Sequence, residues 1–194
     1  LGRSLKLSVT QREDFEVIEQ EIRHIDTIIQ NFLEFSRSPR FEAQFISPSV
    51  IVDRVIALLA HRLKAHDVRV ETVRRQRLPI IEADPERLKE ALVNLMVNAC
   101  EAMASGGRIR ISEETIEDDV TDRAVVIRIE DNGPGIPTDL QDKIFQPFFT
   151  TKEAGTGLGL SIVQRIIHDH QGRIAVSATP GRGTQFTLTF PAKA

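Results

Sequence analysis

Residues 91–103 read ALVNLMVNACEAM, and this stretch predicts a helix with one buried side. Asn94 and Asn98 are four residues apart, so they share a face of that helix, and Glu90 and Glu101 lie within a turn of them. Apolar residues fill the rest of the helix surface. An asparagine carbonyl is a hard oxygen ligand, which suits Mg²⁺ carried by a nucleotide phosphate. The alternative interpretation is that both asparagines are solvated residues on a helix surface, and this stretch alone does not decide between the two.

A second polar segment, IRIEDNGPGIP at residues 127–137, ends a predicted strand with an acid and a glycine-proline-glycine turn. Asp131 offers a carboxylate acceptor suited to the exocyclic amine of adenine, and Gly133 and Gly135 allow the backbone to approach a ligand closely. Asn-Gly is also a strong hairpin signal, which gives a structural alternative. The proline after the glycine and the polar helix expected next argue against that hairpin.

Two further segments follow in order: KIFQPFFTTK at residues 143–152 and GTGLGLSIVQRI at residues 155–166. The phenylalanines of the first could belong to the core, whereas Lys152 could reach a phosphate. The second places three glycines immediately before a helix, where backbone N–H groups and the positive end of the helix dipole suit phosphates. It is neither the G-x-G-x-x-G of dinucleotide-binding folds, because residue 160 is leucine, nor a P-loop, which ends in Gly-Lys-Ser/Thr.

Around these segments, helices and strands alternate from Phe41 onward. Helices are expected from Ser47-Pro48 to about Lys64, from Asp84-Pro85 to about Ala104, and from about Leu158 to His170 with an end at Gly172. Strands are expected at residues 67–73, 78–82, 108–114, 124–130, 173–178 and 184–190, with the acidic stretch EDDVTD at 117–122 as a loop. This alternation predicts an α+β fold, a two-layer α/β sandwich in which a mixed sheet carries three helices on one face.

Residues 11–37 contain no proline or glycine. Six apolar residues follow one another at alternating gaps of three and four: Phe15, Ile18, Ile22, Ile25, Ile29 and Phe32. That spacing is typical of a helix seam that packs against other helices in a coiled coil or four-helix bundle. One such helix cannot bury its seam alone, so a helical partner is expected from an upstream segment or from a second chain, as in a homodimer. Ser38-Pro39 is expected to stop the helix.

The composition is that of a soluble globular chain and excludes several classes of protein. The net charge of −3 over 194 residues gives no electrostatic reason to bind nucleic acid. The single cysteine, Cys100, suggests a buried thiol in a reducing compartment and hence a cytoplasmic location. No stretch approaches the ~18 apolar residues of a membrane span, so no membrane contact is expected in this fragment. The start at Leu1 suggests that an upstream part, which could carry an anchor, is missing.

Taken in this order, the four segments resemble the ATP-binding catalytic domain of bacterial two-component sensor histidine kinases, within the wider family that includes gyrase, Hsp90 and MutL. NLMVNACEA is similar to the asparagine box, EDNGPGIP and GTGLGLSI to the two glycine boxes, and IFQPFFTT to the phenylalanine box. The resemblance covers residues 41–194, and residues 1–38 are similar to the second helix of the dimerisation and phosphoacceptor hairpin. The short spacer between Phe149 and Gly155 predicts a small ATP lid, as in the nitrogen-regulation and oxygen-sensing branch.

The resemblance implies ATP and Mg²⁺ as cofactors and gives roles to individual residues. Asn98, with help from Asn94, would hold Mg²⁺ on the ATP phosphates, and Asp131 would bind the adenine amine. Lys152 would contribute to catalytic stabilisation at the phosphates. The other residues implied at the nucleotide are Gly133, Gly135, Thr151, Gly155, Thr156, Gly157, Leu158, Gly159 and Thr184, the last of which would support Asp131 through water.

The N-terminal histidine does not match the phosphoacceptor of the family. That phosphoacceptor lies in the first hairpin helix, is followed directly by an acidic residue, and has a proline a few positions further on. His24 is followed by Ile25, and no proline comes before Pro39, so His24 is predicted to flank the helix seam. His168 and His170 lie at the end of a later helix, where a structural or solvent-exposed role is expected.

The leading hypothesis is therefore a protein histidine kinase, an ATP-dependent phosphotransferase of two-component signal transduction. This chain would be its catalytic portion, transferring the γ-phosphoryl group to a histidine on a hairpin helix that the chain lacks, for relay to an aspartate of a response regulator receiver domain. The fragment alone is not expected to autophosphorylate. The alternatives are an ATP-binding regulatory scaffold without kinase activity, and a serine kinase of the anti-sigma type or an ATP-hydrolysing clamp related to gyrase.

Overall fold

The computed structural model describes residues 41–74, 78–103, 106–118, 122–152 and 155–192, together with scattered upstream positions. Those upstream positions are helical and exposed: Asp14, Phe15, Val17, Ile18, Glu19, Ile22 and Ile29. The rest of the predicted helix at 11–37, with His24 and the expected stop at Ser38-Pro39, lies outside the described residues. The bundle-forming helix and the domain boundary near residue 40 therefore stay predictions.

From residue 41 onward, the chain alternates between short strands and helices. In chain order these are β1 (Gln44–Ile46), α2 (Pro48–Ala65), β2 (Val68–Arg74), β3 (Ile81–Ala83), α3 (Pro85–Ala102), β4 (Gly107–Asp118), β5 (Asp122–Asp131), the 3₁₀-helix η1 (Thr138–Leu140), α4 (Gly159–Asp169), β6 (Arg173–Thr179) and β7 (Gly183–Pro191). Within the described part of the chain, no helix has the length and apolar character needed to cross a bilayer.

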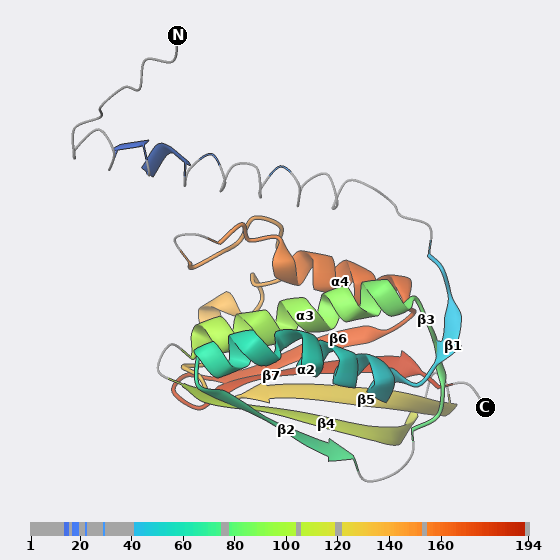
Figure 1. Ribbon diagram of the computed structural model, residues 1–194. Helices are drawn as coiled ribbons and strands as arrows, with labels where there is room; N and C mark the ends of the chain where they lie inside the picture. Colours follow the sequence, from blue (N-terminus) through green and yellow to red (C-terminus); the bar gives the residue numbers. More distant parts are fainter. Residues whose placement is uncertain are drawn as a thin grey trace.

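Five of the strands form one mixed sheet in the order β2-β4-β5-β7-β6. β2 runs parallel to β4, and every other neighbouring pair in this sheet is antiparallel. The helices α2, α3 and α4 all lie on the same face of the sheet (Figure 1). The predicted two-layer α+β sandwich, with three helices on one face of a mixed sheet, is confirmed.

A second, two-stranded sheet was not predicted. β1 pairs antiparallel with β3, and Phe45 lies opposite Glu82. β1 has only three residues, which is too short to display the two-residue period that identifies a strand in a sequence. The strand expected at 78–82 is also displaced, since β3 begins at Ile81, beyond Pro79, which has no N–H to donate to a partner strand.

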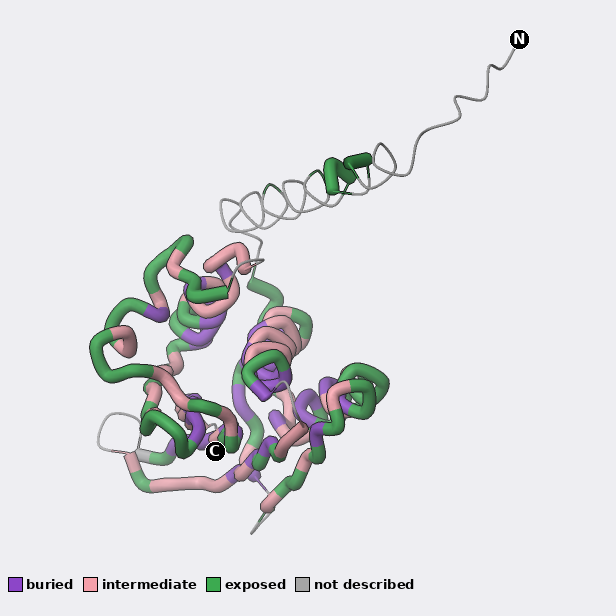
Figure 2. The backbone as a smooth tube through the Cα atoms, turned by 90° about the vertical axis from the view of Figure 1, so that its left-hand side faces the viewer, coloured by how far each residue is buried: buried purple, intermediate pink, exposed green. Residues whose placement is uncertain are grey.

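The hydrophobic core lies between the helices and the large sheet, and Figure 2 shows buried positions on the facing sides of both layers. The buried residues of α3 are Leu88, Ala91, Leu92, Leu95, Met96, Ala99 and Cys100. They belong to the same cluster as Ile109 of β4 and Ile127 of β5. Burial of a side chain of this size stabilises the fold by about 1.5–3 kcal/mol. Because apolar residues occupy the inner side of α3, Asn94 and Asn98 remain at its half-buried flank.

Asp84 fixes the start of α3. Its Oδ1 accepts the backbone N–H of Glu86 at 3.1 Å and that of Arg87 at 3.2 Å, which confirms the predicted start. Its Oδ2 accepts the N–H of Glu42 at 3.0 Å, so the segment before β1 is tied to α3. Ser47, at the start of α2, has the extended backbone of an N-cap, but its side chain makes no capping hydrogen bond, contrary to the prediction.

α4 ends within one residue of its predicted end, but a glycine does not end it. Its last residue is Asp169, and it is Gln171 rather than a glycine that adopts the left-handed conformation, with φ of 56°. A Cβ on Gly172 would lie 2.7 Å from the carbonyl oxygen of Thr189. Gly172 therefore allows the chain to pass close to β7 and does not end the helix.

The β4–β5 hairpin extends further than predicted. β4 continues to Asp118 and β5 begins at Asp122, so part of the acidic stretch 117–122 is strand. Arg173 of β6 forms an ion pair with Asp118. This pairing offsets the repulsion between acidic residues that face each other across the hairpin.

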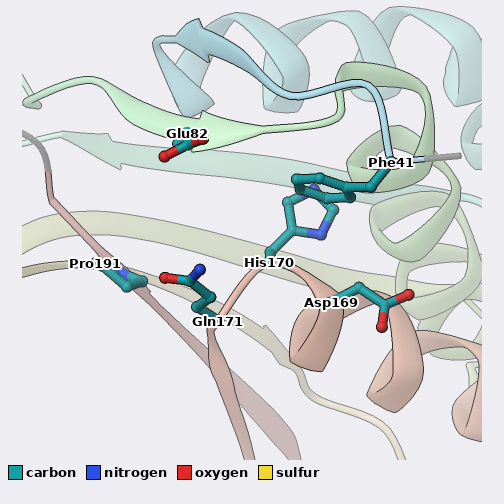
Figure 3. Close-up of a pocket in the computed structure, with 6 residues that line it drawn as sticks. All are labelled: Phe41, Glu82, Asp169, His170, Gln171 and Pro191. Carbon is teal, nitrogen blue, oxygen red and sulfur yellow. The ribbon is translucent and has the colours of Figure 1, made fainter.

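His170 is buried at the end of α4 and joins that helix to the start of α3 (Figure 3). Its Nε2 accepts the N–H of Asp84 at 3.0 Å, so Nδ1 carries the proton and donates to the carbonyl oxygen of Ile166 at 2.7 Å. The ring of Phe41 lies edge-on to the imidazole, with centroids 4.7 Å apart. Burial lowers the pKa of His170 and keeps the ring neutral. His170 thus has a structural role, whereas His168 is exposed.

The neutral His170 should make the stability of the fold depend on pH. Because burial lowers its folded-state pKa below the ordinary value of 6.5, the unfolded state binds more protons as the pH falls through 6.5. This contribution is fully present above pH 6.5 and is lost as the pH falls toward the folded-state pKa. The free energy of unfolding in urea should therefore fall on acidification, by about 1.4 kcal/mol for each unit by which the two pKa values differ.

A pair of histidine variants tests this assignment. His170→Gln should remove that part of the pH dependence, whereas His168→Gln, which alters the exposed histidine on the same helix, should retain it. An unchanged pH dependence in His170→Gln would show that another group is responsible.

Candidate functional site

Asp131 is the last residue of β5 and is 6% exposed. Its Oδ1 accepts the backbone N–H of Gly133 at 2.9 Å and that of Thr184 at 3.2 Å. Burial raises the pKa of the Asp131 carboxyl, and the two N–H groups oppose this by stabilising the charged form. Since Oδ1 is held by the two amides, Oδ2 is the oxygen that a ligand can reach. The backbone N–H of Thr184 thus bonds directly to the Asp131 side chain, whereas the resemblance implies a water between these two residues.

The turn between β6 and β7 holds the loop that follows Asp131. The N–H of Gly181 donates to the carbonyl oxygen of Pro134 at 2.7 Å. Gly183, with φ of 99°, passes so close to the end of β5 that a Cβ would lie 1.9 Å from the carbonyl oxygen of Asp131. The strands expected at 173–178 and 184–190 leave the sequence TPGRG between them as a connecting turn, but its part in the site was not predicted. The signal available was the pair of glycines in a single short turn.

Gly183→Ala should therefore destabilise the fold strongly. The added Cβ meets backbone, which cannot move cheaply, and the residue would keep a positive φ. We expect the free energy of unfolding in urea to fall by about 2–4 kcal/mol. Gly181→Ala is the matched control, because Gly181 also has a positive φ but no atom lies within 4 Å of its added Cβ. It should cost only about 1 kcal/mol. Equal losses in the two variants would show that the close approach to Asp131 does not matter.

The start of α4 lies against the asparagine face of α3. Gly159 is the first residue of α4, and a Cβ there would lie 3.6 Å from Asn94 Oδ1 and 4.0 Å from Asn98 Nδ2. The N–H groups of a first helical turn lack partners within the helix and lie at the positive end of its dipole, so they favour an anion. Amide oxygens and an anion-binding helix terminus therefore share one end of the site.

The phenylalanine segment is divided between core and surface. Phe145 packs edge-on against Phe186, with centroids 6.4 Å apart, and Phe149 packs against the core. Phe148 is exposed and has a positive φ of 67°, so its interpretation as core is wrong. Gly157, with φ of 68°, passes so close that a Cβ would lie 2.4 Å from the carbonyl carbon of Phe148. The two ends of the loop between these residues therefore lie close together, and we call the described residues of that loop, 149–152 and 155–156, the lid.

The lid contains a tight turn that carries Lys152. Thr150 Oγ1 accepts the N–H of Lys152 at 3.1 Å, and the N–H of Gly155 donates to the carbonyl oxygen of Lys152 at 3.1 Å. Lys152 Nζ lies 3.2 Å from Asn98 Oδ1 and 2.6 Å from Glu101 Oε2. Glu101 was expected near the asparagines but without a role, because its contact with a residue 51 positions away leaves no signal in a single sequence.

The remaining predicted residues lie along the same loops. Thr151 is exposed, Gly135 has a positive φ of 74°, and Thr156 Oγ1 lies 3.5 Å from the backbone nitrogen of Leu158. The side chain of Leu158 is fully buried, so its predicted place at a ligand, which stays a prediction, would involve its backbone. Ser161, which was not predicted, is buried and donates to the carbonyl oxygen of Leu158 at 2.8 Å, which secures the turn into α4.

The site therefore has two chemically different ends. A buried carboxylate at one end can accept a hydrogen bond from an amine. At the other end, two amide oxygens, a helix N-terminus and a lysine suit phosphates that carry a hard divalent cation. The donor set on this chain fits Mg²⁺ bound mainly by phosphate oxygens, since amide carbonyls add neutral oxygen ligands to an already charged complex.

Comparison with known proteins gives independent information on this arrangement. The model of the family described as "Histidine kinase-, DNA gyrase B-, and HSP90-like ATPase" matches residues 83–194, which include all four segments singled out above. Signal transduction histidine-protein kinase AtoS of Escherichia coli (strain K12) is 42% identical over 182 residues, which are 93% of this chain and 29% of AtoS. The chain thus spans less than a third of the length of that relative.

Two solved structures share the fold over nearly the whole chain. Full-length ShkA in complex with AMPPNP has a TM-score of 0.79 at 26% identity, over 97% of this chain and 40% of ShkA. Histidine kinase ThkA in complex with response regulator protein TrrA has a TM-score of 0.76 at 30% identity, over 100% of this chain and 53% of the ThkA chain.

Proposed function

Because this chain belongs to the family of histidine kinase-, DNA gyrase B- and HSP90-like ATPases, we propose that it is the catalytic portion of a sensor histidine kinase. It binds Mg-ATP and transfers the γ-phosphoryl group to a histidine on a helical hairpin, from which a response regulator aspartate receives it. The observation that carries this proposal is the position of the first turn of α4 over Asn94 and Asn98. That arrangement joins oxygen ligands for a metal to an anion site, as phosphoryl transfer from a nucleotide requires.

Asp131 selects the base. Its Oδ2 accepts a hydrogen bond from the exocyclic amine of adenine, while Oδ1 stays fixed by the N–H groups of Gly133 and Thr184. Two backbone bonds set the carboxylate orientation before the ligand arrives, so little ordering remains for binding. Burial of Asp131 excludes competing water, which strengthens the bond to the amine.

Asn94, Asn98, Lys152 and the first turn of α4 position the phosphates. Asn98 and Asn94 offer their carbonyl oxygens to the metal, and the N–H groups of the α4 start donate to phosphate oxygens. When bound, Mg-ATP supplies the phosphoryl group and the metal neutralises charge that develops on its oxygens. The γ-phosphorus bond to the ADP oxygen breaks, a bond to the histidine nitrogen forms, and ADP leaves with the electron pair. Thr151, Gly155 and Thr156 lie in the lid that encloses the phosphates.

The partners follow from the same assignment. The ThkA–TrrA complex supports a response regulator receiver domain as the partner that takes the phosphoryl group. The exposed apolar residues at the described upstream positions, among them Phe15, Ile18 and Ile22, support a homodimer joined through paired hairpin helices. A cytoplasmic location, with no nucleic acid or membrane contact in this fragment, completes the proposal.

The test uses nucleotide binding first and phosphoryl transfer second. Titration of this chain with AMPPNP and Mg²⁺ in a calorimeter should give saturable heat. Incubation with γ-labelled ATP and a separately supplied histidine hairpin should then label the hairpin in an acid-labile, alkali-stable form. Acid-stable label on a partner would indicate a serine kinase instead, and binding without label would indicate a regulatory module. No binding at all would overturn the proposal.

A further inference from the structure

Glu101 connects the lid to two helices through its two carboxylate oxygens. Oε2 pairs with Lys152 Nζ of the lid at 2.6 Å, and Oε1 pairs with Arg62 of α2 at 2.6 Å. The same Lys152 ammonium lies 3.2 Å from Asn98 Oδ1, one helical turn away from Glu101 on α3. The Lys152 ammonium thus lies between the Glu101 carboxylate and the Asn98 amide, which is a metal ligand in the proposed function.

We propose that Glu101 is a positioning residue that holds Lys152 against Asn98 until a phosphate-bearing nucleotide draws Lys152 away, and that Arg62 weakens this hold by neutralising part of the charge of the same carboxylate through its other oxygen. The inference rests on the proposed function, because it describes how the phosphate end of that site is kept before ligand arrives. Glu101 itself touches no substrate in this scheme and acts through Lys152.

The Lys152 ammonium and a divalent metal ion cannot both bind Asn98 Oδ1. An ammonium and a divalent cation repel strongly when they share one carbonyl oxygen, so entry of the metal requires Lys152 to leave Asn98. The backbone of Lys152 need not move, because Thr150 and Gly155 hold it in a tight turn. The side chain can swing on its flexible four-carbon stem from Glu101 to a phosphate oxygen.

The hold is weak enough to be released. The side chains of Lys152, Glu101 and Arg62 are 43%, 35% and 44% exposed, so both ion pairs are screened by water. Exposed pairs of this kind change an equilibrium by about two- to five-fold at most. Removing Glu101 should therefore shift nucleotide affinity by about that factor. A larger change would imply a different role.

Substitution of Glu101 and substitution of Arg62 should change nucleotide affinity in opposite directions. Glu101→Gln frees Lys152, so the Kd for AMPPNP with Mg²⁺ at low salt should fall by about two- to five-fold. Arg62→Gln removes the other cation paired with Glu101, so Glu101 holds Lys152 more strongly and the Kd should rise. The Kd for adenosine, which lacks phosphates, should be the same in both variants and the wild type. Glu86→Gln, which removes an acid paired with Lys89 at the other end of α3, is the control and should change neither Kd.

A second measurement needs no nucleotide. Trypsin cleaves after lysine, so the bond after Lys152 should be cut faster in Glu101→Gln and more slowly in Arg62→Gln than in the wild type. In a Lys152→Met background, Glu101→Gln should give no further change in Kd. Equal Kd values and equal cleavage rates in all variants would overturn the inference, as would changes of the same sign in Glu101→Gln and Arg62→Gln. If the wild type bound no AMPPNP, the proposed function would fail, and the cleavage rates would still report on the pair.

Discussion

Asn98→Ala is expected to lower the rate of phosphoryl transfer to a supplied histidine hairpin by about 100-fold or more. In the proposed function Asn98 supplies an oxygen ligand to the metal at the phosphate end of the site, and alanine offers none. The loss should appear in the affinity for Mg²⁺-bound nucleotide as well as in the rate, because the metal would lose a ligand in both the bound complex and the transition state. Titration with AMPPNP at increasing Mg²⁺ and single-turnover transfer assays would measure the two effects.

The fold should survive this substitution. Asn98 is half-buried on the flank of α3, its side chain contacts the exposed Lys152, and alanine favours helix more than asparagine does. Gln164→Ala removes an exposed amide from α4 and is the control, with transfer expected at the wild-type rate. Transfer by Asn98→Ala at the wild-type rate would remove Asn98 from the metal site.

Asp131→Asn is expected to weaken the binding of adenine nucleotides by about 10- to 100-fold, as the loss of a charged hydrogen-bond acceptor does. The amide oxygen of asparagine can still accept from Gly133 and Thr184, so its NH₂ group would take the position of Oδ2. A donor would then face the exocyclic amine of adenine, which is also a donor. Calorimetry with adenosine isolates this end of the site, because adenosine lacks the phosphates.

The free energy of unfolding of Asp131→Asn distinguishes a loss of binding from a folding defect. Burial raises the pKa of Asp131, which means that the charge of this carboxylate costs stability in the folded protein, so a neutral amide of the same shape should not lower the free energy of unfolding. Asp139→Asn, on the exposed 3₁₀-helix η1, is the matched control and should leave adenosine binding unchanged. Unaltered binding by Asp131→Asn would exclude this carboxylate from base recognition.

The parts of this molecule that were predictable share a local cause. α3 could be placed because its apolar period, Asp84 and Pro85 all lie within one short stretch, and the sandwich followed from the alternation of such stretches. Asp131 and the glycines before α4 could be placed because each lies at the junction of a strand or helix with a loop.

The parts that were missed depend on contacts between distant residues. Glycine was expected to end α4, but Gln171 adopts the left-handed conformation and Gly172 is needed for its approach to Thr189. The part of Gly183 in the site likewise arises from its approach to Asp131. Nothing within the neighbourhood of either glycine in the sequence reveals which segment it will approach.

The hold of the β6–β7 turn on Asp131 has a consequence for how the protein matures. Thr184 and Gly183 belong to the strand that the ribosome makes after every other piece of the site. Until β7 has been synthesised, Asp131 Oδ1 lacks the N–H of Thr184, one of the two backbone groups that hold it. The orientation of the Asp131 carboxylate is therefore completed only after β7 has been synthesised and has paired with β5.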